Sequence, residues 1–183
     1  MPALSPRYTI EMLDAMPQEP GARYELVDGL LIVTPAPRPV HAEIVDGVIH
    51  ALHIGVPRTA ARVASPGEIR FGHTNSLQPD ILVYPATFRG KTTWKEVTEW
   101  WLAVEVVSPS SRGYDREEKR LAYLAHGVPT YWVVDPETRT IEVWHTSSSK
   151  PRIVHDSLAW TTPSGHRVEI ELEGLFRDVP RES

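Results

Sequence analysis

The chain of 183 residues contains no cysteine, which excludes disulfide bonds, thiol nucleophiles and thiolate-bound metal ions. The side-chain ligands of any metal ion must therefore come from carboxylates or from the eight histidines. The composition, with 41% hydrophobic and 23% charged residues, predicts one globular domain over residues 1–183 with a proper hydrophobic core.

Long apolar runs and an excess of positive charge are also missing. No run approaches the roughly 20 residues that a membrane span needs, and the N-terminal stretch MPALSPRYTIEMLD lacks a basic start followed by an apolar segment. We therefore expect a soluble, cytoplasmic protein without a membrane partner. The formal net charge of −5 argues against binding nucleic acid by bulk electrostatics, so a nucleic-acid role needs a local basic face or bound cations.

Turn and periodicity signals organise the first part of the chain. A short helix is predicted over residues 8–16, and RYELVDGLLIVTP predicts a β-hairpin that turns at Asp28-Gly29. Apolar residues spaced by four in PVHAEIVDGVIHAL predict a helix over residues 39–52. The segment ARVASPGEIRF predicts a second strand pair around Ser65-Pro66-Gly67.

The centre of the chain has the apolar pattern of buried strands. ILVY (81–84) and WLAVEVV (101–107) are almost continuous apolar runs, as is TYWVVDP (130–136). A helix is predicted over residues 114–126, with Tyr114, Leu121, Leu124 and Ala125 on its apolar face. TIEVWH, RIVH and HRVEIEL predict outer strands, whereas the ends MPALSPR and RDVPRES are expected to be frayed. The sum predicts an α/β or α+β fold with helices packed on a mixed sheet.

Two acidic residues stand out in these buried strands. Asp80 directly precedes one of them, in LQPDILVY, and Glu105 lies inside another, in LAVEVVSPSS. A desolvated carboxylate either protonates or needs a positive partner, and two facing carboxylates repel each other unless a cation lies between them. This pattern indicates a hard divalent metal site. The structural alternatives are that Asp80 organises a turn and that Glu105 pairs with an arginine across the sheet.

A third element lies on the helix that follows Glu105. Asp115, Lys119 and Tyr123 are spaced by four and therefore share one side of that helix. The short loop SPSSRG returns this helix across the sheet, where Lys119 is in reach of the two acids. The alternative for Lys119 is an exposed ion pair with Asp115, worth only a few tenths of a kcal/mol.

The order of these residues resembles a known group of enzymes. Pro79-Asp80, a hydrophobic strand with Glu105, and Lys119 on the next helix resemble the PD-(D/E)XK nuclease superfamily. The segments YELVDGLL, QPDILVY, VEVVSPSS and GVPTYWVVDP, with the helix that opens at His41, resemble more closely the Uma-two family of restriction endonucleases. The resemblance covers about residues 23–175. It implies a restriction endonuclease-like fold, with a mixed central sheet flanked by helices and an N-terminal β-hairpin.

The resemblance also implies roles for individual residues. It makes Asp80 and Glu105 the metal-binding acids, with the backbone carbonyl of Val106 as a further ligand. The superfamily usually has a lysine two residues after the strand glutamate, where this chain has Val107. In this family a lysine on the following helix replaces it, and Lys119 is the matching residue.

Further residues match weaker positions of the family. The resemblance places Glu25, in YELVDG, near the site, and His41 at a recurrent histidine whose alternative role is structural. Glu43 is a weaker candidate for an acid on the helix that precedes the sheet. Asp115 and Tyr123 are near-site candidates because they share the helix face of Lys119.

Two functions follow from this interpretation. The first is an endonuclease that uses Mg²⁺, or alternatively Mn²⁺, to hydrolyse phosphodiester bonds in DNA with Asp80, Glu105 and Lys119. The second is a catalytically weak or inactive member that uses the same fold to bind nucleic acid or a protein partner. A homodimer is expected, because cutting both strands of a duplex takes two sites and twofold assemblies are common.

Overall fold

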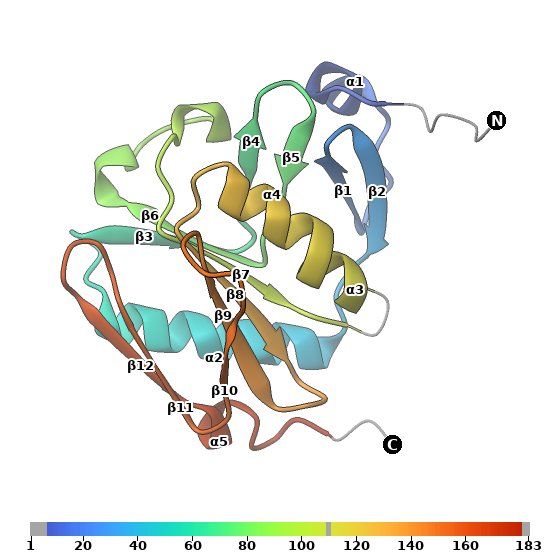
Figure 1. Ribbon diagram of the computed structural model, residues 1–183. Helices are drawn as coiled ribbons and strands as arrows, with labels where there is room; N and C mark the ends of the chain where they lie inside the picture. The colour runs from blue at the N-terminus through green and yellow to red at the C-terminus, as the bar shows by residue number, and fades with distance from the viewer. Residues whose placement is uncertain (1–6, 109–110, 181–183) are drawn as a thin grey trace.

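The computed structural model describes residues 7–108 and 111–180 (Figure 1). Most of the two ends that the sequence predicts to be frayed lies outside these residues, and the single domain over residues 1–183 stays a prediction. Within the described ranges, none of the helices combines the length and the apolar character that crossing a membrane requires. The helical segments are α1 (Ile10–Ala15), α2 (Pro39–Gly55), η1 (Ala86–Phe88), η2 (Trp94–Glu96), α3 (Arg112–Tyr114), η3 (Asp115–Lys119), α4 (Arg120–Ala125) and α5 (Leu172–Leu175).

The largest sheet has six strands in the order β10-β9-β8-β7-β6-β3. Strands β7 and β8 are parallel and the other neighbours are antiparallel, so the sheet is mixed, as predicted. β7 and β8 are buried along their whole length, which explains their continuous apolar runs. The strands are β3 (Ala61–Ala64), β6 (Ile81–Pro85), β7 (Leu102–Val106), β8 (Thr130–Asp135), β9 (Thr140–His145) and β10 (Arg152–Val154).

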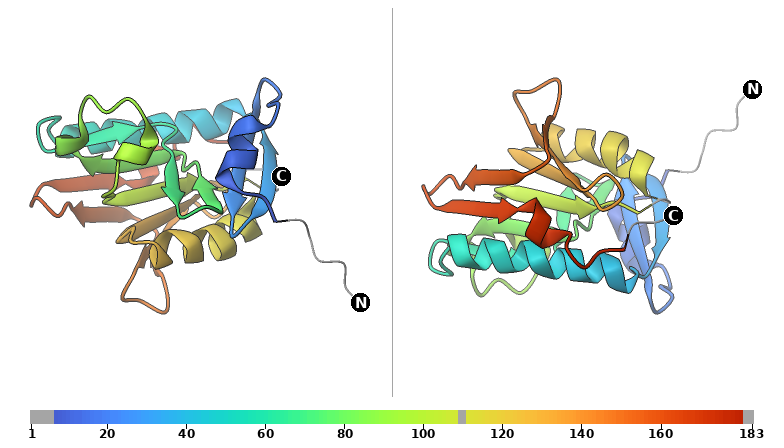
Figure 2. Two further views of the ribbon diagram at one scale, coloured as in Figure 1. Left: turned by 90° about the horizontal axis from the view of Figure 1, so that it is seen from above. Right: turned by 90° about the horizontal axis from the view of Figure 1, so that it is seen from below.

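Helices cover both faces of this sheet, with α2 on one side and the α3–α4 segment on the other (Figure 2). Successive residues of β7 point to opposite faces. Val104 and Val106 join the core that contains the buried residues of α2, whereas Ala103 and Val107 join the core that contains Tyr123 of α4. Since Glu105 alternates with the first pair, its carboxylate points toward the α3–α4 side.

The predicted hairpin is confirmed and belongs to a second sheet. Strands β1 (Ala22–Val27) and β2 (Leu30–Pro35) pair antiparallel around Asp28 and Gly29, whose φ angles are 49° and 80°. Glycine and aspartate tolerate this left-handed conformation better than most residues. The sheet order is β2-β1-β5-β4, with β4 (Ile69–Phe71) and β5 (Asn75–Leu77).

The predicted strand pair around Ser65-Pro66-Gly67 is wrong. β3 pairs with β6 in the large sheet, whereas β4 pairs with β5 in the second sheet. The two strands on either side of this turn therefore belong to different sheets. The two apolar segments do form strands, but the strands with which they pair lie later in the chain.

A glycine packs tightly in this crossing segment, and its substitution tests the packing. We expect Gly67→Ala to lower the free energy of unfolding by about 2 kcal/mol, because an added Cβ would collide with the side chain of Leu82 in the core. Gly174→Ala is the matched control, since its Cβ would meet nothing within 4 Å. Chemical denaturation measures both, and equal stabilities of the two variants would contradict this packing.

The predicted helix over residues 114–126 forms, but its apolar face is only partly the one expected: Tyr114 and Leu124 pack against the core, whereas Leu121 and Ala125 are exposed. Leu121 is 57% exposed, whereas Asp115, Lys119 and Tyr123 are at most 4% exposed. The polar side of this helix therefore faces the sheet. This orientation removes the alternative in which Lys119 and Asp115 form an exposed surface pair.

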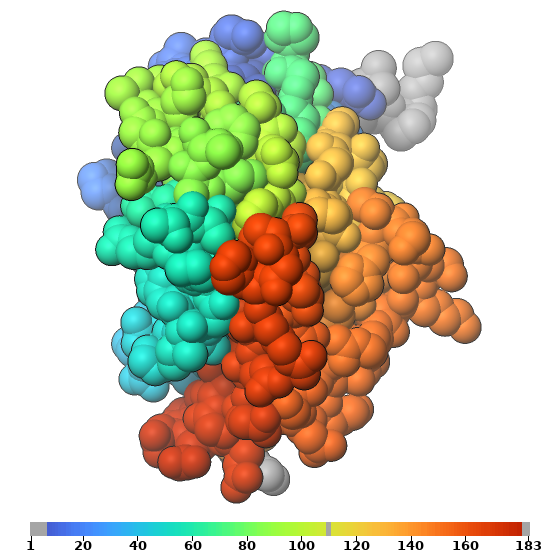
Figure 3. Space-filling model, turned by 90° about the vertical axis from the view of Figure 1, so that its left-hand side faces the viewer, coloured from blue at the N-terminus to red at the C-terminus, as the bar shows by residue number. Residues whose placement is uncertain are grey.

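The last strands form a separate antiparallel pair, β11 (Ser157–Thr161) and β12 (Arg167–Glu171). β11 was not expected from the sequence, although its residues alternate between exposed and buried. In Figure 3 this orange-red pair lies between the teal α2 segment and the orange β9–β10 region. Trp160 of β11 packs edge-to-face on Trp132, with ring centres 5.7 Å apart. The pair thus covers the α2 side of the core and leaves the opposite side to the α3–α4 segment.

Candidate metal centre

Asp80 and Glu105 meet where β6 begins and β7 ends. Ile81 lies opposite Val104 in the antiparallel pairing, and continuing this register by one residue places Asp80 opposite Glu105. Residues directly opposite each other share one face of a sheet. The two side chains are 3% and 2% exposed. Strand pairing therefore brings two acids together in a desolvated environment.

Three donors surround the carboxylate of Asp80. Arg23 of β1 donates a hydrogen bond to Oδ1 at 2.9 Å, and Nε2 of His41, at the start of α2, lies 3.0 Å from Oδ2. The backbone N–H of Val106 donates to Oδ2 at 2.9 Å. Burial by itself raises the pKa of Asp80, but the bond and charge of His41, the charge of Arg23 and the Val106 N–H together lower it to about 2. Asp80 is therefore an ionised carboxylate held in one orientation.

Glu105 has a different environment. Its Oε1 accepts hydrogen bonds from Nζ of Lys119 at 3.1 Å and from the hydroxyl of Tyr123 at 3.0 Å. Burial raises the pKa of Glu105 well above its ordinary value, against the charge of Lys119 and with the added repulsion of Asp80. A negative charge on Glu105 is thus costly in this site unless further positive charge is supplied.

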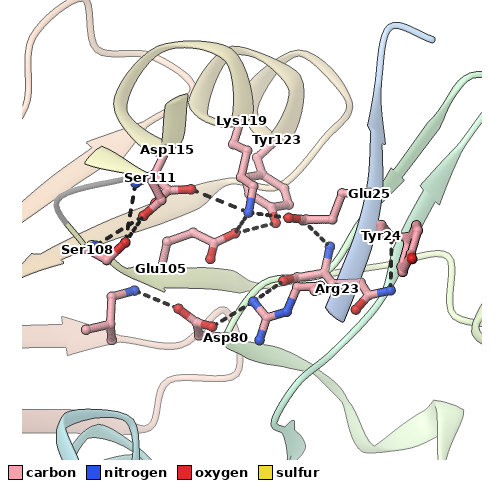
Figure 4. Close-up of polar contacts among 12 residues, drawn as sticks. Arg23, Tyr24, Glu25, Asp80, Glu105, Ser108, Ser111, Asp115, Lys119 and Tyr123 are labelled. Carbon is pink, nitrogen blue, oxygen red and sulfur yellow. Dashed lines mark hydrogen bonds and ion pairs between the residues drawn. The ribbon is translucent and has the colours of Figure 1, made fainter. Parts of the chain in front are cut away.

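Lys119 is the central cation of the site (Figure 4). Its Nζ lies 2.8 Å from Oε2 of Glu25, 3.1 Å from Glu105 and 3.4 Å from Oδ1 of Asp115. Burial would lower the pKa of Lys119, but these three carboxylates raise it well above its ordinary value. The other oxygen of Glu25 accepts the backbone N–H of Gln78 at 2.8 Å, which fixes that carboxylate. Lys119 is therefore an ammonium with three acidic neighbours.

A π-helical turn aims these side chains inward. The turn spans Asp115–Lys119 and joins α3 to α4 without a break. π-Helical turns are rare and are frequently found at functional sites. Here the turn and the first turns of α4 direct Asp115, Lys119 and Tyr123 toward the sheet, where all three are buried. The helix therefore places polar side chains next to Glu105.

The charges of the site do not balance. Four buried carboxylates, those of Glu25, Asp80, Glu105 and Asp115, face the ammonium of Lys119 and, at the edge, the guanidinium of Arg23 and the imidazole of His41. Hard divalent cations such as Mg²⁺ prefer oxygen ligands of this kind. The donor set and the excess negative charge therefore fit such a cation.

The number of side-chain ligands is small. Among residues 7–108 and 111–180, no three side chains of His, Asp or Glu are arranged to hold a metal ion. A cation bound by Asp80 and Glu105 would therefore take its remaining ligands from the backbone, from water or from a phosphate. Mg²⁺ tolerates this well, because it usually keeps several waters and uses one or two carboxylates.

Most residues singled out in the sequence come together here. Glu25, His41, Asp115 and Tyr123 each contact one of the three central residues. Glu43 does not: its side chain is exposed and outside the residues that line the cavity described below. Because Glu43 lies two residues after His41 on α2, it points away from the face that carries His41.

Arg23 is the residue that the sequence did not indicate. It lies on β1, is half-buried and bonds both Asp80 and, at 3.2 Å, the backbone carbonyl of Gln78. The only available signal was its place two residues before Glu25, which puts both side chains on one face of the strand. That face is the one directed at the site.

A cavity of about 420 Å³ opens over these residues. Asp80, Glu105 and Lys119 line it together with groups from the β2–α2 connection and from the end of the described chain, among them Pro37 and Val179. The acids are therefore at the bottom of a space that a small group can enter.

Comparison with known proteins places this chain in a family. The sequence model of the Uma2 family, described as "Putative restriction endonuclease", matches residues 10–173. A solved structure from Anabaena variabilis ATCC 29413, described as "a putative nuclease belonging to DUF820", is 21% identical, with a TM-score of 0.75 over 92% of this chain and 97% of that chain. At this identity the likeness shows a shared fold. None of the curated proteins matches. Since the family match spans most of the chain, this protein belongs to the Uma2 family.

Proposed function

We propose that this protein is a metal-dependent endonuclease that hydrolyses phosphodiester bonds in DNA. The observation that carries the proposal is the pair of buried acids, Asp80 and Glu105, which lie with Lys119 at the bottom of a cavity. Membership of the Uma2 family supports a nuclease function. A homodimer and a cytoplasmic location accompany this proposal as predictions.

Asp80, Glu105 and the backbone carbonyl of Val106 would hold Mg²⁺, or Mn²⁺ in its place. A bound Mg²⁺ supplies a Lewis acid for the phosphoryl oxygen and a more acidic water. Arg23 and His41 keep the Asp80 carboxylate ionised and oriented. The protein itself thus provides a preorganised pair of ligands with little freedom to move.

Lys119 takes the role of the lysine that is missing at Val107. Its ammonium lies 3.1 Å from Glu105, so it reaches the same space as a lysine on the strand would reach. There it donates hydrogen bonds to the attacking water or to a phosphate oxygen and neutralises charge that develops in the transition state. The hydroxyl of Tyr123 donates a hydrogen bond to the same oxygen of Glu105, Oε1, that Lys119 contacts.

The proposal is tested by cleavage of labelled DNA with added Mg²⁺ or Mn²⁺. We expect the wild type to cleave DNA and to stop when a chelator is added. Cleavage by the Asp80→Asn variant should be at least about 100-fold slower, because loss of a metal ligand should lower activity more than loss of a residue that only supports a ligand. Asp46→Asn, on the exposed side of α2, is the matched control and should cleave like the wild type.

One result would favour the other function. A folded wild type that cleaves no single-stranded, double-stranded or branched DNA with either metal ion would contradict the proposal. The same fold would then serve as a module that binds nucleic acid or a protein partner.

A further inference from the structure

The depth of the acids restricts what can reach them. Asp80 and Glu105 are 3% and 2% exposed, so a phosphate has to enter the cavity to lie beside them. A volume of about 420 Å³ is at the lower end of the roughly 300–1,000 Å³ typical of small-molecule sites. The space suits about one nucleotide and is not a groove that could seat a double helix.

The cavity has the two kinds of surface that one nucleotide needs. Its polar side holds the acids with Arg23, His41 and Lys119, where a phosphate and its cation belong. The lining also contains apolar residues, namely Ile32, Pro35, Ala36, Val40 and Val179. An unpaired base offers an apolar face that can pack against such residues, whereas a base inside a duplex is already stacked.

The charges of the residues that line the cavity also favour an unpaired strand over a duplex. A protein that makes about 6–10 phosphate contacts to duplex DNA neutralises these phosphates with Lys and Arg side chains. The Lys and Arg side chains that line this cavity are those of Arg23, Arg38, Arg112 and Lys119. Arg23 is paired with Asp80, Arg112 with Asp135 and Glu137, and Lys119 with three carboxylates. With a net charge of −5 on the chain, the lining can serve only a few phosphates.

We infer that the site takes a flexible single strand of DNA, of which about one nucleotide enters the cavity, and that it does not take an intact duplex. This inference rests on the proposed function, since it names the form of DNA that the same site accepts. The base lies on the apolar residues around Ala36 and Val40, and the phosphate points to Asp80 and Glu105.

Binding tests this inference separately from cleavage. A fluorescein-labelled single-stranded oligodeoxynucleotide and the same strand annealed to its complement are titrated with the Glu105→Gln protein in the presence of a chelator, so that no cleavage occurs, and fluorescence anisotropy is recorded. We expect the single strand to bind at least about ten-fold more tightly, because the duplex must first unstack and unpair a nucleotide. The slope of log K against log salt concentration should be shallow, about −1 to −2, for two or so phosphates.

A matched pair of variants tests whether the single strand binds in the cavity. Ala36→Trp adds a large side chain to the lining of the cavity and should weaken single-strand binding at least about ten-fold. Ala125→Trp, at a residue that is also exposed but lies outside the cavity, should leave binding unchanged. Circular dichroism confirms that both are folded. Duplex binding as tight as single-strand binding, or equal binding by the two variants, would overturn the inference. Single-strand binding without cleavage by the wild type would instead count against the nuclease proposal alone.

Discussion

Glu105→Gln is expected to remove cleavage while making the metal-free protein more stable. The glutamine keeps the shape and can still accept hydrogen bonds from Lys119 and Tyr123, but it removes one of four buried carboxylates. Burial raises the pKa of Glu105 well above its ordinary value, so its ionised form opposes folding. We expect the free energy of unfolding to rise at neutral pH and the rate of cleavage to fall at least about 100-fold.

Urea denaturation in the presence of a chelator measures the first effect, and the cleavage assay measures the second. Glu43→Gln is the matched control, because Glu43 is exposed on α2 and away from the cavity. It should leave both quantities unchanged. A Glu105→Gln protein that is less stable than the wild type would show that Glu105 serves the fold through its pairing with Lys119, as in an ordinary buried ion pair.

Lys119→Met is expected to have the opposite effect on stability. It leaves Glu25, Glu105 and Asp115 buried without the ammonium that lies within 3.4 Å of each of them. Removing one partner of a buried ion pair costs about 3–5 kcal/mol, because the remaining charge stays desolvated. Cleavage should be lost as well, since the proposed cation at the phosphate is gone.

A second variant separates folding from catalysis. In the double variant Lys119→Met with Glu25→Gln, one of the stranded carboxylates is neutral, and we expect recovery of at least about 1 kcal/mol of stability without recovery of cleavage. Lys150→Ala, at an exposed lysine, is the control for removal of a lysine. Denaturation curves measure the stability of each variant, and cleavage rates measure its activity. A single Lys119→Met variant as stable as the wild type would mean that the three carboxylates do not depend on Lys119.

Much of the centre could be read from the sequence because its signals are local. The runs ILVY and WLAVEVV are long enough to indicate buried strands, and an ionisable residue within such a run is conspicuous. The spacing of four between Asp115, Lys119 and Tyr123 predicted a shared helix face, and the structure confirms it. The resemblance to the Uma-two family, which depended on the order of these residues, is confirmed by the family match.

The remaining features depend on long-range pairing, which the sequence does not reveal. Arg23 reaches Asp80 only because the β1–β2 hairpin lies beside the large sheet, and its place two residues before Glu25 does not reveal this contact. β3 and β4 find partners in two different sheets, although they flank one turn. Leu121 is exposed because the helix turns Asp115 and Lys119 toward the sheet, although Tyr114 and Leu124 of the predicted apolar face do pack against the core.

The central claim is that Asp80 and Glu105 together bind a divalent cation, and a crystal grown with Mn²⁺ tests it most directly. Anomalous scattering locates the ion without reference to activity. The account predicts a peak that both carboxylates contact at about 2.0–2.6 Å, and that disappears in the Glu105→Gln protein. A site without a peak at saturating Mn²⁺, with Lys119 still bound to Glu105, would contradict it.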